Sequence, residues 1–211
     1  MTPPTVNASY SSSLNQIQFP AGILQPPFFD AYADDAVNYG DIGSTIGHEI
    51  SHGFDDQGSK YDASGKLENW WTEEDRKNFD VRTKALSNQF DAYEPLPGIH
   101  INGQLTLGEN TADLAGLVIA YKAYKIALGG KPAPILDGLT GDQRFYIAYG
   151  QSWRQKDRDG RLRARLLSNP HSPPEYRVNG IVRDDDAWYG AFPVAPTDKY
   201  YIAPEARVHL W

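Results

Sequence analysis

The first pattern of apolar and polar positions predicts a β-hairpin at the start of the chain. Residues 7 to 19 alternate weakly, with Ile17 and Phe19 separated by Gln18, and the turn-rich stretch YSSSLN divides them into two short runs. Alternation with a period of two places successive side chains on opposite faces of a strand, and Ser and Asn favour the connecting turn.

The next pattern predicts a helix. After QPPFFD, whose prolines enforce extended backbone, Ile42, Ile46, Ile50 and Phe54 recur every four residues. This spacing describes one face of a helix that ends near Gly53. The polar residues of GHEISHG fall off that apolar stripe.

Later segments predict further helices and little else. Thr72 and Asp75 resemble a capping box that opens a helix running toward Phe90. The other predicted helices run from just after Gly108 to Gly129, over GDQRFYIAYGQSWRQ, over Arg161 to Leu167, and in short pieces between Asp185 and Phe192. The chain shows no internal repeat and no low-complexity linker, so we expect one α+β, mostly α-helical domain over residues 1–211, with a small β element.

Composition narrows the classes of function. The 211 residues, 40% of them hydrophobic, are enough for a sizeable core. A net charge of −7 disfavours nucleic acid and anionic membrane surfaces as partners. There is no cysteine, so any metal must be held by His, Asp or Glu. The chain carries no signal-like start and no run long enough to span a membrane, so we expect a soluble protein whose compartment, cytoplasmic or exported, the sequence leaves unknown.

The segment GHEISHG offers candidate metal ligands. In a helix, positions i and i+4 lie on one face, so His48 and His52 can direct their imidazoles at a single zinc ion. Glu49 is rotated away from the metal but remains close enough to take a proton from a metal-bound water. Taken alone, this motif leaves two interpretations open, a catalytic centre or a helix with solvated polar residues.

A second i, i+4 pair favours the catalytic interpretation. A catalytic zinc site needs a third protein ligand and one open position. GENTADLAG supplies Glu109 and, one turn later, Asp113, which can accept the second N–H of a ligating histidine. Singly, these acidic residues would be solvated groups near a helix start, where negative charge is favourable. Two such pairs in one cysteine-free chain predict a zinc site held by His48, His52 and Glu109.

Four ordered blocks resemble a known family. VNASY…IQFPAGILQPPFF, GHEISHGFDDQGSKYDASGKLENWWT, GENTADLAGL and NPHSPPEYRVNG are similar to the catalytic part of the neprilysin-type (M13) zinc endopeptidases, which include bacterial oligoendopeptidase O and the endothelin-converting enzymes. The resemblance runs nearly end to end. It implies a thermolysin-like gluzincin fold in which two helices hold one Zn²⁺ per chain beneath a small sheet at the substrate edge.

The resemblance also implies roles for individual residues. It makes His48, His52 and Glu109 the zinc ligands, Glu49 the general base and Asp113 the partner of a ligating histidine, in agreement with the interpretation from the residues alone.

Four further positions come mainly from the resemblance. His171 matches a histidine that stabilises the oxyanion, and Arg177 matches an arginine that binds a substrate carbonyl. Without the family they would be a surface-loop histidine and a structural ion-pair partner. Asn7 and Ala8 match the segment that pairs with extended substrate backbone.

One departure from the family concerns the large helical lobe that precedes this region in its members and closes over the active site. The sequence given lacks that lobe, whereas its end, ARVHLW, resembles the family's C-terminus. Two explanations stay open, a fragment of a longer protein or a minimal stand-alone enzyme. In either case we expect the active-site face to be covered by a missing lobe or by self-association.

The expected function is hydrolysis of small peptides, on the amino side of hydrophobic residues, by a Glu-activated zinc-bound water. The alternative is a zinc-stabilised binding or inhibitory module with little turnover, and a purely structural zinc site is the weakest choice, because such sites close all four positions. The basic run from Lys156 to Arg165 is assigned to a solvated face or ion pairs, and Trp70 and Trp71 are interpreted as core and packing residues. Asp55 and Asp56 either orient His52 or cap a turn.

Overall fold

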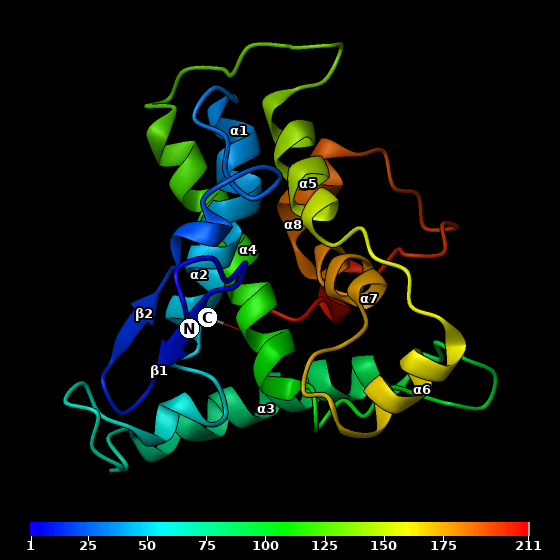
Figure 1. The fold of residues 1–211 in the computed structure, drawn as a ribbon. Coiled ribbons are helices and arrows are strands. Elements are labelled where there is room, and N and C mark those ends of the chain that lie inside the picture. Colours follow the sequence, from blue (N-terminus) through cyan, green and yellow to red (C-terminus); the bar gives the residue numbers. More distant parts are fainter. Residues whose placement is uncertain (211) are drawn as a thin grey trace.

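The computed structural model describes residues 1–210 and has the expected mostly helical fold with a small sheet (Figure 1). Strands β1 (Ser9–Ser11) and β2 (Gln16–Gln18) pair antiparallel with Tyr10 opposite Ile17, which confirms the hairpin. Trp211, the last residue of the segment ARVHLW, lies outside the described residues. The helices are α1 (Asp35–Asn38), the π-helical turn η2 (Tyr39–Gly43), α2 (Ser44–Ser51), α3 (Glu73–Asp91), α4 (Leu107–Ala127), α5 (Gly141–Ser152), α6 (Asp159–Ser168), α7 (Pro174–Asn179) and α8 (Asp186–Ala191).

The helix ends follow from local capping. Thr72 Oγ1 accepts the backbone N–H of Asp75 at the start of α3, although the reciprocal bond of a full capping box is absent from this pair. Thr140 and Gln143 do form both bonds of a capping box and open α5. The chain leaves α4 through Gly129, whose φ of +58° is the left-handed conformation that glycine adopts without strain.

The segment α1–η2–α2 forms one helical column. Its predicted apolar stripe is buried at Ile42 but faces outward from Ile46 onward, contrary to the usual orientation of such a stripe. Ile46, Ile50 and Phe54 are 39%, 44% and 43% exposed, whereas His48 and Glu49 are buried. The reason is that α4 packs against the side of α2 that carries Gly47, so the polar side of α2 is the buried one.

Trp70 and Trp71 are packing residues at the edge of the molecule and do not belong to the buried core. Trp70 is 48% exposed and Trp71 is half-buried. Their rings meet edge to face, Trp70 also contacts the exposed Phe54, and Trp71 contacts the buried Phe79. The core lies elsewhere.

The core surrounds α4, which passes through the middle of the molecule (Figure 1). The hairpin and α2 lie on one side of α4 in this view, and α5, α7 and α8 lie on the other. The large side chains that are less than 2% exposed include Leu86 and Phe90 of α3, Leu117 and Tyr124 of α4, Phe145 of α5 and Ile181. Within residues 1–210, no helix has both the length and the apolar character that crossing a bilayer requires.

Two glycines allow α2 and α4 to touch through their backbones. A Cβ added to Gly47 would lie 2.7 Å from the carbonyl oxygen of Gly116, and a Cβ added to Gly116 would lie 2.5 Å from the backbone nitrogen of His48. Real Cβ atoms do not approach backbone atoms this closely, so neither position accepts a side chain without separating the helices. This crossing holds His48 beside the first half of α4.

We predict that Gly116→Ala lowers the free energy of unfolding by about 2 kcal/mol or more, because the added methyl group overpacks a backbone contact. The matched control is Gly190→Ala in α8, where an added Cβ meets no atom within 4 Å. The control should change stability by less than about 1 kcal/mol. Urea unfolding followed by circular dichroism measures both, and equal values for the two variants would contradict the proposed tight crossing.

Candidate metal centre and active site

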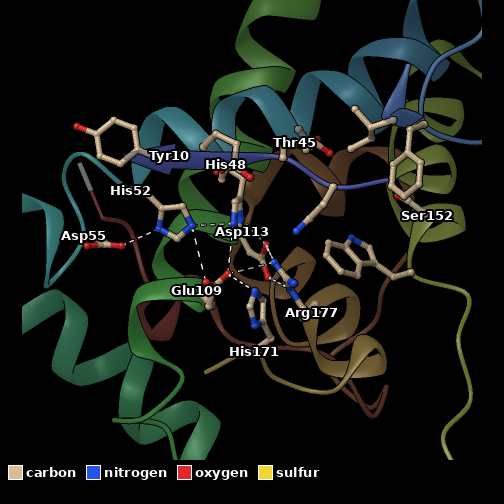
Figure 2. A pocket seen from close by; sticks show the side chains of 18 of the residues that line it. Tyr10, Thr45, His48, His52, Asp55, Glu109, Asp113, Ser152, His171 and Arg177 are labelled. Carbon is tan, nitrogen blue, oxygen red and sulfur yellow. Dashed lines mark hydrogen bonds and ion pairs between the residues drawn. The ribbon is translucent and has the colours of Figure 1, made fainter. Parts of the chain in front are cut away.

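The two histidines of α2 point at the same place. His48 lies in the last turn of α2 and His52 is its C-cap residue. Their Nε2 atoms are 3.0 Å apart and their rings are nearly perpendicular, at 88°. The i, i+4 spacing therefore brings the two ring nitrogens together, and Figure 2 shows both rings directed toward Glu109.

Glu109 completes a set of three donors. It projects from the first turn of α4, and its Oε2 lies 3.3 Å from His48 Nε2 while its Oε1 lies 3.8 Å from His52 Nε2. One ligand atom from each of the three residues lies within 4.8 Å of the other two.

The donor set fits zinc. Zinc is commonly held in catalytic sites by two imidazole nitrogens and one carboxylate oxygen, with the fourth position open. Glu109 Oε2 is enclosed and has no hydrogen-bond partner among residues 1–210, although an enclosed carboxylate oxygen normally has one. A cation in this position would supply the missing interaction.

Carboxylates hold the outer nitrogen of each histidine. His48 Nδ1 is 2.8 Å from Asp113 Oδ1, and His52 Nδ1 is 2.7 Å from Asp55 Oδ2. An Nδ1–H that donates to a carboxylate leaves the Nε2 lone pair free for a metal. Asp55 also accepts the backbone N–H groups of Gln57 and Gly58, so it both orients His52 and caps the following turn. The sequence had left these two roles as alternatives.

Asp113 forms a buried ion pair with Arg177. Arg177 donates to it through Nε and Nη2, each at 2.7 Å, and both side chains are buried. Burial alone would raise the pKa of Asp113, but the charge and hydrogen bonds of Arg177, together with His48, hold this pKa well below its usual value. The carboxylate is therefore ionised and able to accept from His48.

The buried charges also set the protonation of the donors. Burial lowers the pKa of His48, but the nearby carboxylates of Asp113 and Glu109 outweigh it and raise this pKa to about 9. Burial raises the pKa of Glu109, whereas His48, Arg177 and His171 lower it to about 2.

Glu49 lies in the same cavity without joining the donor set. It is 6% exposed, and burial raises the pKa of its carboxyl group against the opposing charges of His48 and His52. A carboxylate with a raised pKa is a stronger base than one in water.

His171 and Arg177 approach the donor set from the C-terminal part of the chain (Figure 2). His171 Nε2 lies 3.3 Å from Glu109 Oε2, and its Nδ1 is 3.0 Å from Asn169 Oδ1. Arg177 lies on α7 and its guanidinium stacks 3.9 Å above the ring of Trp153. His171 is therefore not a free surface-loop residue, and Arg177 is an ion-pair partner that also lines the cavity.

Asn7 and Ala8 precede β1 and line the other wall of the cavity. Asn7 is exposed and Ala8 is buried. The structure thus brings all nine predicted site residues to one cavity of about 650 Å³: Asn7, Ala8, His48, Glu49, His52, Glu109, Asp113, His171 and Arg177.

The sequence analysis missed another part of this cavity. Asp41, Ser44, Thr45, Ser152 and Trp153 also line it. Ser44 and Thr45 lie four and three residues before His48, so the helical spacing that joined the two histidines could have found them. No sequence signal placed Asp41, because the π-helical turn that carries it shifts the helical register.

Comparisons with known proteins agree with this geometry. Residues 7–208 match peptidase family M13. The chain superimposes with a TM-score of 0.98 on the zinc metalloprotease ZMP1 of Mycobacterium tuberculosis in complex with an inhibitor, at 54% identity over 100% of this chain and 33% of that chain. It is 40% identical to human neprilysin over 98% of this chain and 28% of that protein. It is also 40% identical to the neutral endopeptidase of Lactobacillus helveticus, over 97% of this chain and 30% of that protein.

The chain thus spans a third or less of the length of these relatives. The match nevertheless covers nearly all of the chain itself, including the two helices that carry the donor set and the segment that carries His171 and Arg177. This chain belongs to peptidase family M13.

Proposed function

We propose that this chain carries the catalytic centre of a zinc endopeptidase that hydrolyses small peptides on the amino side of hydrophobic residues. The observation that carries the proposal is the convergence of His48, His52 and Glu109, with their ligand atoms within 4.8 Å of one another, in a cavity that also contains Glu49. Zinc, when bound by these three residues, supplies a Lewis acid that polarises the scissile carbonyl and acidifies the attacking water.

Glu49 acts as the general base and then as the general acid. It takes a proton from the attacking water and delivers it to the leaving amine. Its burial supports this role, because a carboxylate whose pKa is raised both accepts and releases a proton near neutral pH more readily than an exposed one.

His171 and Arg177 stabilise the negative charge that develops on the substrate. Within residues 1–210, Arg177 uses Nε and Nη2 for Asp113, and its Nη1 group makes no hydrogen bond. This group is therefore available to a substrate carbonyl. His171 Nε2, near Glu109, is available to the oxyanion of the tetrahedral intermediate. Asp113 is a positioning residue, since it acts through His48 and Arg177.

The hairpin supports binding of an extended peptide. In the described part of the chain β1 pairs only with β2, so its other edge offers unpaired backbone groups along the cavity. An extended peptide can add to such an edge as a further strand. Asn7 and Ala8, at the start of this edge, would pair with the substrate backbone.

We predict that Glu49→Gln lowers kcat by about 100-fold or more while the protein still binds one zinc ion, because the amide cannot take the proton. Hydrolysis of a fluorogenic peptide and metal analysis of the same sample measure the two quantities. The control is Glu68→Gln, at an exposed carboxylate. Unchanged hydrolysis by Glu49→Gln would exclude the proposed base, and zinc binding without hydrolysis by the unmodified chain would instead support a binding module.

Metal removal should weaken the fold, because zinc binds the folded chain and stabilises it by mass action. We expect a chelator to lower the unfolding temperature of the unmodified chain. In His52→Ala the chelator should have little effect, because losing one of three ligands weakens zinc binding by about 100-fold or more. His100→Ala, outside the cavity, is the matched control and should keep the full chelator response. An identical response of both variants would contradict the assignment of His52.

Breaking the buried ion pair should be costly. Arg177→Met leaves Asp113 charged and buried, so we expect a loss of about 3–5 kcal/mol in the free energy of unfolding. The double change with Asp113→Asn should recover part of the loss. The control is Lys66→Met, which removes an exposed pair with Glu68 and should cost about 1 kcal/mol or less. A loss for Arg177→Met no larger than that of the control would show that Asp113 is not charged in the fold.

A further inference from the structure

The cavity continues from the zinc ligands along α2 toward the start of the helical column. Ser44 and Thr45 lie one turn before His48, and Asp41 lies seven residues before it, on η2. At the helical rise this is roughly 10 Å along the axis. Figure 2 shows Thr45 and Ser152 on the side of the donor set away from Tyr10 and Asp55. We call the part lined by Asp41, Ser44, Thr45, Ser152, Trp153, Ile23 and Phe28 the side branch.

The side branch is lined by two polar atoms that lack partners. Asp41 is 2% exposed and Ser44 is 4% exposed. Asp41 Oδ1 and Ser44 Oγ are enclosed, and neither has a hydrogen-bond partner among residues 1–210. A buried polar group without a partner is unfavourable, and both oxygens can accept a hydrogen bond, so these two atoms of one cavity form a site for a hydrogen-bond donor.

The surroundings of Asp41 favour a donor over another acceptor. Its carboxylate faces the C-terminal end of α5, where Ser152 is the last residue and where the helix dipole is negative. In the described part of the chain Asp41 forms no ion pair, and burial raises its pKa to about 7, although the side chain of Ser152 lowers it. Nothing supplied by these residues neutralises the carboxylate.

The walls of the side branch are apolar. Ile23 is buried, and Phe28 and Trp153 are half-buried along the cavity. Apolar walls hold the hydrocarbon or ring portion of a side chain, while the buried oxygens of Asp41 and Ser44 can contact a polar group at its tip.

We propose that the side branch binds a substrate side chain with an apolar stem and a hydrogen-bond donor at its tip, as in tyrosine or lysine, and that Asp41 and Ser44 recognise that donor. This inference rests on the proposed peptidase function and refines its expected preference for hydrophobic residues. A purely apolar side chain would fill the walls and leave both acceptors unpaired. A site built for a donor discriminates strongly against the analogue that lacks it.

Binding can be measured without turnover. The Glu49→Gln variant, loaded with zinc, is titrated calorimetrically with two pairs of peptides, Phe against Tyr and norleucine against Lys, placed in turn on each side of the cleavable bond. We expect the donor-bearing member to bind about tenfold more tightly at one of these positions. A preference for Tyr alone or Lys alone also supports the site and identifies the donor. Equal binding within both pairs at both positions would overturn the proposal.

Substitutions of Asp41 separate its role from that of the catalytic centre. Asp41→Leu should abolish the preference within both pairs and keep the binding of the Phe peptide. Asp41→Asn, which keeps an acceptor but no charge, should lose the preference for Lys and retain that for Tyr. The control is Asp35→Asn, an exposed carboxylate on the same helical column, which should change neither. Unaltered preferences in both Asp41 variants would overturn the proposal.

Failure of the two proposals can be told apart. If the unmodified chain hydrolyses both members of each pair equally, the proposed donor recognition in the side branch is wrong, and the proposed peptidase function is supported. If it cleaves nothing while Glu49→Gln binds the Tyr or Lys peptide more tightly, the donor site stands and the peptidase function fails.

Discussion

The structure depends on the backbone contact between α2 and α4. Gly47 and Gly116 let the two helices approach until a Cβ at either position would meet backbone atoms of the other helix. Side chains can then reach across the crossing at hydrogen-bond distance, His48 from one helix and Glu109 and Asp113 from the other. A larger residue at either glycine would separate these groups by about the size of a methyl group. Hydrogen bonds between them would then be broken. The packing of the two helices and the geometry of the donor set therefore depend on the same close approach.

The close crossing of α2 and α4 buries the carboxylate of Asp113, and the contacts of this carboxylate join segments that are distant in the sequence. Asp113 is buried between His48 of α2 and Arg177 of α7, and each contact lies between 2.7 and 2.8 Å. Because an isolated buried carboxylate is strongly unfavourable, α7 must dock with its arginine in place. The same docking brings His171, in the segment before α7, next to Glu109. The catalytic arrangement is thus partly a consequence of neutralising one buried acid.

The sequence patterns predicted those features of the structure that depend on interactions between residues close together in the chain. The hairpin, the long helices and the two i, i+4 pairs depend on nearby residues, and these parts were found. The orientation of α2 was not predicted, because the spacing of apolar residues identifies a helix face but does not show which face packs against another helix. Ile46 and Ile50 are exposed while Glu49 is buried, since α4 selects the side with the small glycine. His171 and Arg177 have no spacing relation to α2 or α4, so only the family resemblance connected them to the site.

The π-helical turn explains how one helical column serves two partners. In an unbroken α-helix, Gly40 and Gly47 would point in nearly the same direction, within about 20°. In the structure Gly40 contacts α5, where an added Cβ would lie 2.1 Å from the carbonyl oxygen of Phe145, whereas Gly47 contacts α4. The wider turn η2 lies between them and rotates one half of the column relative to the other. It also faces Asp41 toward the end of α5, so the turn that fits the column to two neighbours produces the acceptor-lined side branch.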